Sequence, residues 1–178
     1  YKYAMTLDGK TASASGDSRW VSGEAARCRV HEVRGQLSAI MVGVDTVLAD
    51  DPLLTCRIPG GRDPLRIVCD SRARTPLDSR LIQSAGEIPT IIAAVGWNER
   101  AAALKKAGAQ ILLCGERDGR VDLRELMRQL GARGVDSILL EGGTTLAFAA
   151  LEAGIVRKVQ AYIAPKLLGG STARTPAG

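Results

Sequence analysis

Six short runs of β-branched and aliphatic residues constrain the fold more than any other feature of the sequence. Each run is nearly continuous in apolar character, which is typical of strands that are buried on both faces of a sheet. Such strands need helices on both sides to cover them. The six runs are Ala39–Val44, Leu65–Cys69, Thr90–Val95, Gln110–Cys114, Ser137–Leu140 and Val159–Ala164.

Helical patterns lie between these runs. Three of the four expected helices follow a side chain that can accept hydrogen bonds from free backbone N–H groups. The expected starts are after Ser22, after Asn98, after Asp122 and at Thr144 or Thr145. Strands that alternate with helices over short connections predict an α/β sheet covered on both faces. Residues 57–64 and 70–84 are irregular and predict loops close to strand ends.

The composition narrows the class of protein. The 178 residues suffice for one domain, and no apolar run approaches the roughly 18 residues of a membrane-spanning helix. Four separated cysteines and a single histidine predict no metal site, and Cys69 and Cys114 are expected in the core. We expect a cytoplasmic protein. Because the chain begins at Tyr1, we also expect it to be part of a longer polypeptide with a domain upstream.

The charge of +5 favours a phosphorylated small molecule as the ligand over nucleic acid. The 24 Lys and Arg residues are scattered instead of forming a block, and aromatic residues make up only 3% of the chain. Proteins that bind single-stranded nucleic acid use aromatic side chains on which bases stack. We therefore expect no nucleic-acid partner.

The segment Glu141-Gly142-Gly143-Thr144 places two glycines between a buried strand and a helix. Glycines let a ligand approach the backbone, and the N-terminus of a helix attracts anions. Ligands of open α/β sheets gather at the carboxyl ends of the strands. The segment is either a cradle for a diphosphate or a plain strand-to-helix turn. Glu141 is either exposed or hydrogen-bonded to ligand hydroxyls.

Three further segments carry candidate ligand contacts. Ser71 and Arg72 follow a buried strand and suit the 2′-phosphate of an NADP-type cofactor, or form a surface turn. Trp20 is either a core anchor or a flat wall for a nicotinamide ring. The pair Asp50-Asp51 favours a turn over acid–base chemistry. His31 is expected to pack on its helix and not to act in catalysis.

Taken together, the motifs resemble the reductase domain of riboflavin biosynthesis. In bacteria this domain is the C-terminal half of the bifunctional diaminohydroxyphosphoribosylaminopyrimidine deaminase/5-amino-6-(5-phosphoribosylamino)uracil reductase. The matching segments cover essentially the whole chain. They are MTLDGKTA, GDSRWVS, VRGQLSAIMVGVDTVLADDPLLTCR, PLRIVCDS, SILLEGGTTL and YIAPKLLGG.

The resemblance implies a dihydrofolate-reductase-like α/β fold with a mixed, mostly parallel sheet, the cofactor NADPH and a homodimer. It places Ser18, Arg34, Leu54, Arg57 and Glu141 against a phosphoribosylaminopyrimidine substrate. The arginines would hold the phosphate and Glu141 the ribose hydroxyls. The residues implied for the cofactor are Ala4, Trp20, Thr46, Asp50, Ser71, Gly143, Thr144, Thr145, Leu146, Ala147, Phe148 and Ala149. The turn role of Asp50 is thereby replaced by a cofactor role.

The implied reaction reduces the ribosyl group of 5-amino-6-(5-phosphoribosylamino)uracil to a ribityl chain. The residue that supplies the proton is open between Lys2, Asp8, Asp50 and bound water. Relatives, mostly archaeal, reduce the pyrimidine before deamination, and the motifs do not distinguish the two orders. Two other hypotheses are an enzyme acting on a folate or pterin, and a non-catalytic NADP-binding module. Members of the family continue beyond GGSTARTPAG through one or two strands, so we expect an exposed sheet edge here.

Overall fold

A five-stranded parallel sheet forms the centre of the protein. The computed structural model describes residues 1–15 and 21–177, and the strand order is β5-β4-β3-β2-β8. The five strands coincide with five of the six apolar runs, so the expected α/β sheet is confirmed. Their bounds are β2 (Ala39–Gly43), β3 (Leu65–Cys69), β4 (Thr90–Ala94), β5 (Gln110–Leu113) and β8 (Ile138–Leu140).

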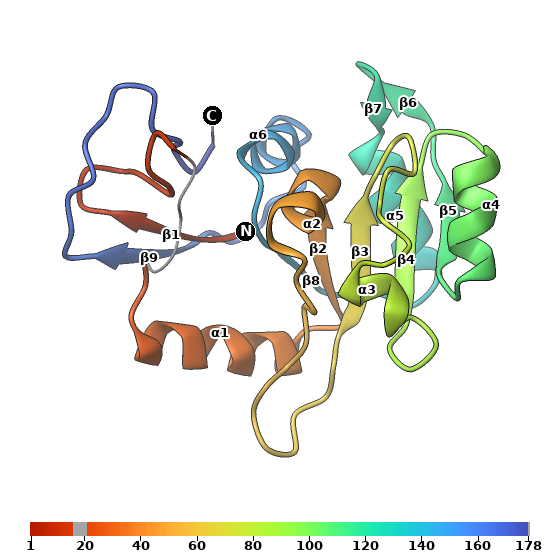
Figure 1. Ribbon diagram of the computed structural model, residues 1–178, viewed down its shortest axis with the longest axis horizontal. Coiled ribbons are helices and arrows are strands. Elements are labelled where there is room, and N and C mark those ends of the chain that lie inside the picture. Colours follow the sequence, from red (N-terminus) through yellow and green to blue (C-terminus); the bar gives the residue numbers. More distant parts are fainter. Residues whose placement is uncertain (16–20, 178) are drawn as a thin grey trace.

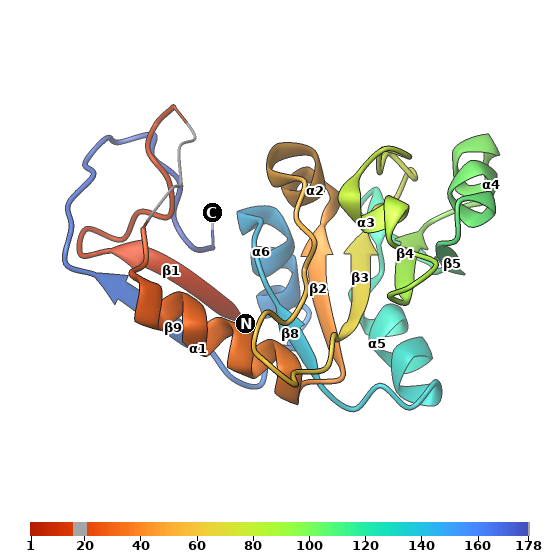
Figure 2. The same cartoon turned by 60° about the horizontal axis from the view of Figure 1, so that its bottom comes forward.

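Helices cover both faces of this sheet (Figures 1 and 2). On one face, α5 (Leu123–Ala132) and α6 (Thr144–Glu152) pack with strand residues such as Met41 and Ile67 in one core. On the other face, α2 (Val44–Asp50), α3 (Arg80–Gln83) and α4 (Glu99–Lys106) share a second core with Ile40 and Val68. Neighbouring residues of β2 and β3 thus contribute to opposite cores, which explains the unbroken apolar runs.

The sixth run was expected to be another strand buried on both faces, and this prediction is wrong. The strand β9 (Gln160–Ala164) pairs in parallel with β1 (Lys2–Thr6) in a separate two-stranded sheet. Its side chains alternate in burial, and Ile163 is 57% exposed. A pairing between Lys2 and Glu141 continues the first sheet into the second. The helix α1 (Glu24–Gln36) runs past the junction of the two sheets (Figure 1).

The helix caps were predicted correctly in two of three cases. Asn98 accepts a hydrogen bond from the N–H of Ala101 at 2.8 Å, and Asp122 accepts one from the N–H of Arg124 at 2.8 Å. The prediction for Ser22 is wrong, because α1 has Gly23 as its N-cap and no side-chain cap. As expected, α6 begins at Thr144.

Several short elements were not expected. The helix α2 occupies part of the segment 46–57, and α3 lies within the segment 70–84. A hairpin of β6 (Glu116–Arg117) and β7 (Arg120–Val121) contains the one antiparallel pair found in the described residues. No helix in the described part of the chain is both long and apolar enough to cross a membrane.

Candidate functional site

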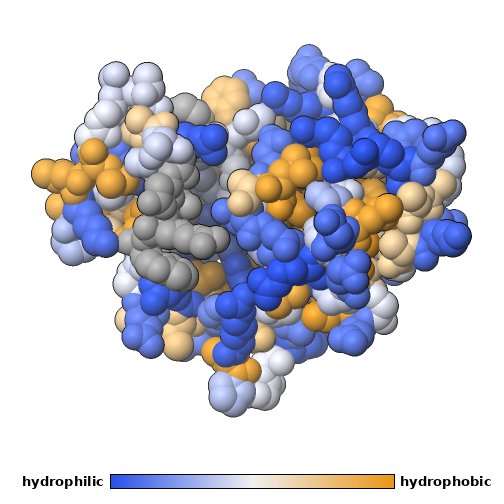
Figure 3. Space-filling view, viewed as in Figure 1, coloured by the Kyte–Doolittle hydropathy of each residue, from blue (hydrophilic) through white to orange (hydrophobic). Residues whose placement is uncertain are grey.

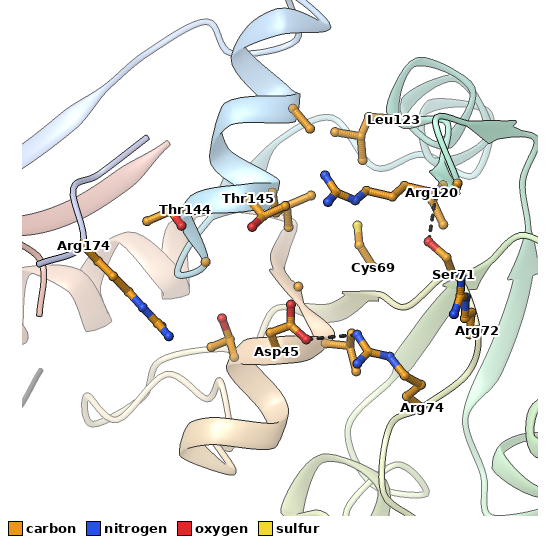
Figure 4. A pocket seen from close by; sticks show the side chains of 18 residues that line it. Asp45, Cys69, Ser71, Arg72, Arg74, Arg120, Leu123, Thr144, Thr145 and Arg174 are labelled. Carbon is orange, nitrogen blue, oxygen red and sulfur yellow. Dashed lines mark hydrogen bonds and ion pairs between the residues drawn. The ribbon is translucent and has the colours of Figure 1, made fainter. Parts of the chain in front are cut away.

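A cavity of about 670 Å³ lies at the carboxyl ends of β2, β3 and β8 (Figure 4). Its lining includes Gly43 and Cys69, which end β2 and β3, and Gly143 in the turn after β8. Thr144 and Thr145, at the start of α6, line the side where the backbone N–H groups of a helix are free. The cavity therefore offers anion-binding groups at the edge where ligands of open α/β sheets gather.

The glycine turn between β8 and α6 is fixed by its backbone and by its neighbour. Gly142 has φ +64° and Gly143 has φ +56°, a region that residues with a Cβ rarely adopt. A Cβ on Gly142 would lie 2.8 Å from Oγ1 of Thr46, on the first turn of α2. The two glycines thus allow the turn to pack closely against α2 and leave the start of α6 open to the cavity.

Arginine side chains surround the cavity. In Figure 4, Arg120 and Arg174 extend into it from opposite sides of the start of α6. Arg72 and Arg74 line the wall formed by the segment after β3, and Arg74 forms an exposed ion pair with Asp45 at 3.0 Å. Four guanidinium groups around one cavity suit a ligand with several phosphate groups.

The β6–β7 hairpin closes one wall of the cavity. Oγ of Ser71 accepts a hydrogen bond of 3.0 Å from the N–H of Val121. This contact joins the segment after β3 to the hairpin that carries Arg120. Ser71 therefore lies in the cavity wall with part of its hydrogen-bonding capacity already used.

A second group of charged residues lies on the other side of the glycine turn. Arg34 of α1 donates to Glu141 through two nitrogens, with Nε 2.9 Å from Oε1 and a terminal nitrogen 2.8 Å from Oε2. Both side chains are largely buried, at 12% and 11% exposed. Lys2 lies close enough to both to influence their charge interactions, and its Nζ lies 5.7 Å from the ring centre of Tyr162.

Burial and the neighbouring charges lower the pKa values of Lys2 and His31, and the charges around Glu141 lower its pKa against the effect of burial. Burial alone would raise the pKa of Glu141, but the hydrogen bonds and charge of Arg34, with the charges of Lys2 and His31, outweigh it and lower the pKa. Burial lowers the pKa of Lys2, partly offset by the charge of Glu141. Burial and the charge of Arg34 also lower the pKa of His31. Glu141 is therefore ionised at neutral pH beside a lysine that releases its proton more easily than usual.

The segment after α2 forms a rim beside these charges. The carbonyl of Thr55 accepts hydrogen bonds from Arg34 at 3.1 Å and from Nδ1 of His31 at 3.2 Å. Leu54 is buried with φ +54°, an unfavourable backbone conformation that its surroundings must hold. The side chain of Arg57 is exposed two residues after Thr55. The hydrogen bonds of Thr55 thus join this rim to the helix that carries the ion pair.

The family comparison covers the entire sequence. The description "RibD C-terminal domain" matches residues 1–178. The chain belongs to the RibD C-terminal domain family. This confirms the resemblance that the sequence motifs indicated.

Relatives of this RibD C-terminal domain have related names. The chain is 54% identical to the riboflavin biosynthesis protein RibD of Actinobacillus pleuropneumoniae, over 99% of this chain and 47% of that protein. It is 46% identical to the 2,5-diamino-6-ribosylamino-4(3H)-pyrimidinone 5′-phosphate reductase of Methanothermobacter thermautotrophicus, over 97% of this chain and 79% of that protein. The chain thus spans about half the length of the RibD protein that it matches.

Solved structures of the family share the fold. The deaminase/reductase of Thermotoga maritima superposes with a TM-score of 0.80 at 29% identity, over 99% of this chain and 46% of that one. A RibD structure from Acinetobacter baumannii gives a TM-score of 0.83 at 31% identity, over 98% of this chain and 47% of that one. The dihydrofolate-reductase-like α/β fold is therefore confirmed.

The cofactor residues predicted for this RibD domain divide into two groups. Seven line the cavity, namely Thr46, Ser71, Gly143, Thr144, Thr145, Leu146 and Ala149. The other described ones do not appear in its lining: Ala4 lies in β1, Asp50 is exposed at the end of α2, Ala147 is fully buried and Phe148 is 50% exposed. Trp20, and the substrate residue Ser18, lie outside the described residues.

The structure separates the three residues considered as proton donors. The carboxylate of Asp8 accepts hydrogen bonds from Thr6 and from the N–H groups of Leu168 and Gly169, and these lower its pKa to about 2. Asp8 is therefore an ionised acceptor that orders the segment after β9. Asp50 lies at the far end of α2 from the cavity, and Lys2 alone of the three lies beside Glu141.

Sequence reasoning missed several residues of the cavity. Arg120 follows an Asp-Gly pair, a hairpin signal that could have placed it in a tight turn. Arg74 is two residues from a predicted contact. The sequence around Arg174 carries no pattern that indicates a ligand site. Its carbonyl accepts a hydrogen bond from the N–H of Thr11, and this contact between distant segments brings it to the cavity. In the described residues, no group of three or more His, Cys, Asp or Glu side chains could hold a metal ion.

Proposed function

We propose that this chain is the NADPH-dependent reductase that converts the ribosyl group of 5-amino-6-(5-phosphoribosylamino)uracil to the ribityl form in riboflavin biosynthesis. One observation carries the proposal. The buried ion pair of Arg34 and Glu141 lies on one side of the turn at residues 141–143. The arginine-lined cavity lies on its other side. A reductase must hold a dinucleotide and a reducible group side by side, and this arrangement offers a place for each.

The lining of the cavity fits NADPH. Gly143 lines the cavity without a side chain, and the start of α6 offers free N–H groups. In the proposal, residues 143–145 hold the diphosphate, and Ser71 and Arg72 hold the 2′-phosphate. When bound, NADPH supplies the hydride for the reduction.

The chain's own residues would position the substrate and supply its proton. Arg34 orients Glu141 through two hydrogen bonds, so that Glu141 can accept hydrogen bonds from ribose hydroxyls. Lys2 holds a proton beside this carboxylate, and its lowered pKa suits it to protonate the substrate nitrogen. Arg57, exposed on the rim, is free of the ion pair and would bind the 5-phosphate.

A decisive assay follows the absorbance of NADPH at 340 nm after addition of the phosphoribosylaminopyrimidine. The reductase hypothesis predicts that the absorbance falls and that the ribityl product forms in equal amount. A non-catalytic NADP-binding module would bind NADPH without this loss. Turnover of a folate or pterin instead would favour the other dihydrofolate-reductase-like activity.

A second candidate function is the same reduction carried out on the substrate before its deamination. The relative from Methanothermobacter thermautotrophicus is named as a reductase of the diamino pyrimidinone, so the chain could accept the substrate before deamination. Comparing kcat/KM for the deaminated and the diamino substrate decides between them. The higher value identifies the physiological order.

The assembly is a further part of the proposal. We propose a cytoplasmic homodimer, in the native protein fused to a deaminase domain. Figure 3 shows apolar side chains gathered at the end of the molecule formed by the segments after β1 and β9. Leu7 is 64% exposed there and Leu167 75% exposed, and the edge of β9 away from β1 has no partner among the described strands. A monomer mass in light scattering at micromolar concentration would contradict the dimer.

We expect Arg57→Ala to weaken substrate binding. Removal of a charge-assisted contact to a phosphate costs about 1.5–3 kcal/mol, which is roughly a 10- to 150-fold higher KM. The kcat should change little, because Arg57 is proposed to bind the phosphate and not the carbon that is reduced. Steady-state kinetics with varied substrate provide the measurement, and Arg62→Ala, on the same exposed loop, is the matched control. An unchanged KM would remove Arg57 from the site.

We expect Arg72→Ala to reduce the preference for NADPH over NADH. The guanidinium is proposed to pair with the 2′-phosphate, which NADH lacks, so only NADPH should lose affinity. The measurement is the ratio of kcat/KM values for the two cofactors. Arg117→Ala, an exposed arginine outside the cavity lining, serves as the control. An equal ratio before and after the change would contradict the assignment.

A further inference from the structure

The segment from Asp70 to Thr75 is a closed loop that supplies three side chains to the cavity. Oδ2 of Asp70, on a fully buried side chain, accepts hydrogen bonds from the N–H of Thr75 at 2.6 Å and from its hydroxyl at 2.8 Å. Between these two residues, Ser71, Arg72 and Arg74 line the cavity. The conformation of this loop therefore decides where those three side chains lie.

The middle of the loop has an unfavourable backbone conformation. Ala73 has φ +55° and is completely buried, and its N–H donates to the carbonyl of Asp70 at 3.0 Å. A residue with a Cβ seldom adopts this left-handed region, and it does so only when its surroundings enforce it. An interaction from outside the loop therefore helps to hold the turn, beside the hydrogen bonds that Asp70 accepts.

The first turn of α4 provides that interaction. Nε of Arg100 donates to the carbonyl of Ala73 at 2.9 Å, and a terminal nitrogen of Arg100 donates to the carbonyl of Arg74 at 3.2 Å. The side-chain amide of Asn98 lies 3.5 Å from the carbonyl of Arg72. Three consecutive carbonyls of the loop thus face donors from one helix end. Arg100 itself is exposed and has no place in the cavity lining.

We propose that Arg100 is a positioning residue for the cofactor site. By binding two carbonyls around the left-handed turn, it keeps Arg72 and Arg74 directed into the cavity. The inference rests on the proposed function, because it assigns the consequence to NADPH affinity. Without Arg100 the turn relaxes toward conformations that Ala73 prefers, and the guanidinium groups of the loop lose their alignment. The reacting end of the site, at Lys2 and Glu141, does not depend on this loop.

The test uses Arg100→Met, which keeps much of the length of the side chain but removes its donors. We expect the Kd for NADPH, measured by fluorescence titration, to rise about tenfold while kcat at saturating NADPH stays within about twofold. Lys106→Met removes one positive charge from the same helix without touching the loop, and should leave both values unchanged. An unchanged Kd in Arg100→Met would overturn the inference.

Relief of the backbone strain distinguishes positioning from a general structural effect. Glycine adopts a left-handed φ without penalty, so Ala73→Gly combined with Arg100→Met should recover most of the lost NADPH affinity. Hydrogen exchange at the N–H groups of Ala73 and Thr75 should be faster in Arg100→Met than in the wild type. A double variant that binds as poorly as Arg100→Met, or exchange that is unaltered, would overturn the inference.

The same titration separates this inference from the proposed function. Wild-type protein that fails to bind NADPH overturns the proposed function and the inference that rests on it. Wild-type protein that binds NADPH, with an Arg100→Met variant that binds equally well, overturns the inference alone.

Discussion

Replacing Glu141 by Gln is expected to abolish most of the activity and to destabilise the fold. The substitution leaves the largely buried guanidinium of Arg34 without its carboxylate partner. Breaking a buried ion pair from one side costs on the order of 3 kcal/mol. Lys2 would also lose the negative charge that supports its protonated form. Urea denaturation measures the stability, and the NADPH oxidation assay measures the activity.

A double variant provides the control for this prediction. Arg34→Met together with Glu141→Gln removes both charges, so its loss of stability should be smaller than the sum of the two single losses. The activity should remain low in all three variants, because the proposed site needs the carboxylate. Strict additivity of the stability losses would show that the two side chains do not form a functional pair in solution.

The same carboxylate makes stability depend on pH. The folded-state pKa of Glu141 lies below the ordinary value of 4.5, so in mild acid the unfolded chain binds the proton more readily. Its stabilising contribution is therefore complete above about pH 4.5 and is lost as the pH falls through the folded-state pKa. Asp8, with a pKa of about 2, acts in the same direction at lower pH. The Glu141→Gln variant should show a shallower loss of stability in acid than the wild type.

The second large effect is expected from Gly142→Ala. The alanine would have to keep the backbone φ of +64°. Its Cβ would lie 2.8 Å from Oγ1 and 3.1 Å from Cγ2 of Thr46. The left-handed backbone and the steric overlap together cost about 2–4 kcal/mol. Because the turn also forms the edge of the cavity, the Kd for NADPH should rise as the turn shifts. Denaturation curves and fluorescence titration report the two effects separately.

Two variants define what this result means. Gly131→Ala lies within α5, where a Cβ meets no atom within 4 Å, and it should increase stability by about 0.5–1 kcal/mol. Adding Thr46→Ala to Gly142→Ala removes the overlap but not the backbone strain, so part of the stability should return. If Gly142→Ala were as stable as the wild type, the close packing of the turn against α2 would be refuted.

The sequence was sufficient for the elements whose signals are local. Strands such as β2 and β4 are buried on both faces, so their apolar runs are unbroken, and Asn98 and Asp122 cap helices through their own side chains. Local signals were insufficient for α2, which has seven residues and a glycine N-cap without a side-chain bond. Two turns are too short for a helical period to stand out.

Non-local effects account for the other differences. The apolar run 159–164 has the composition of a buried strand, but β9 pairs only with β1 among the described strands and its outer face stays open. The glycine turn and Ser71 were located at the cavity because they follow strand ends directly. Arg174 and the left-handed Ala73 depend on contacts with distant segments, and no pattern in their own neighbourhoods indicates them.

The single backbone pairing between Lys2 and Glu141 has a mechanical consequence. Among the described residues, this bridge is where the small sheet meets the large one, and Glu141 is also bonded through its N–H to the carbonyl of Met41. The bridge therefore links the small sheet directly to the residue that forms the ion pair with Arg34. A displacement of Lys2 together with its sheet would change its separation from the carboxylate of Glu141, so the arrangement of these charges depends on how the two sheets are joined.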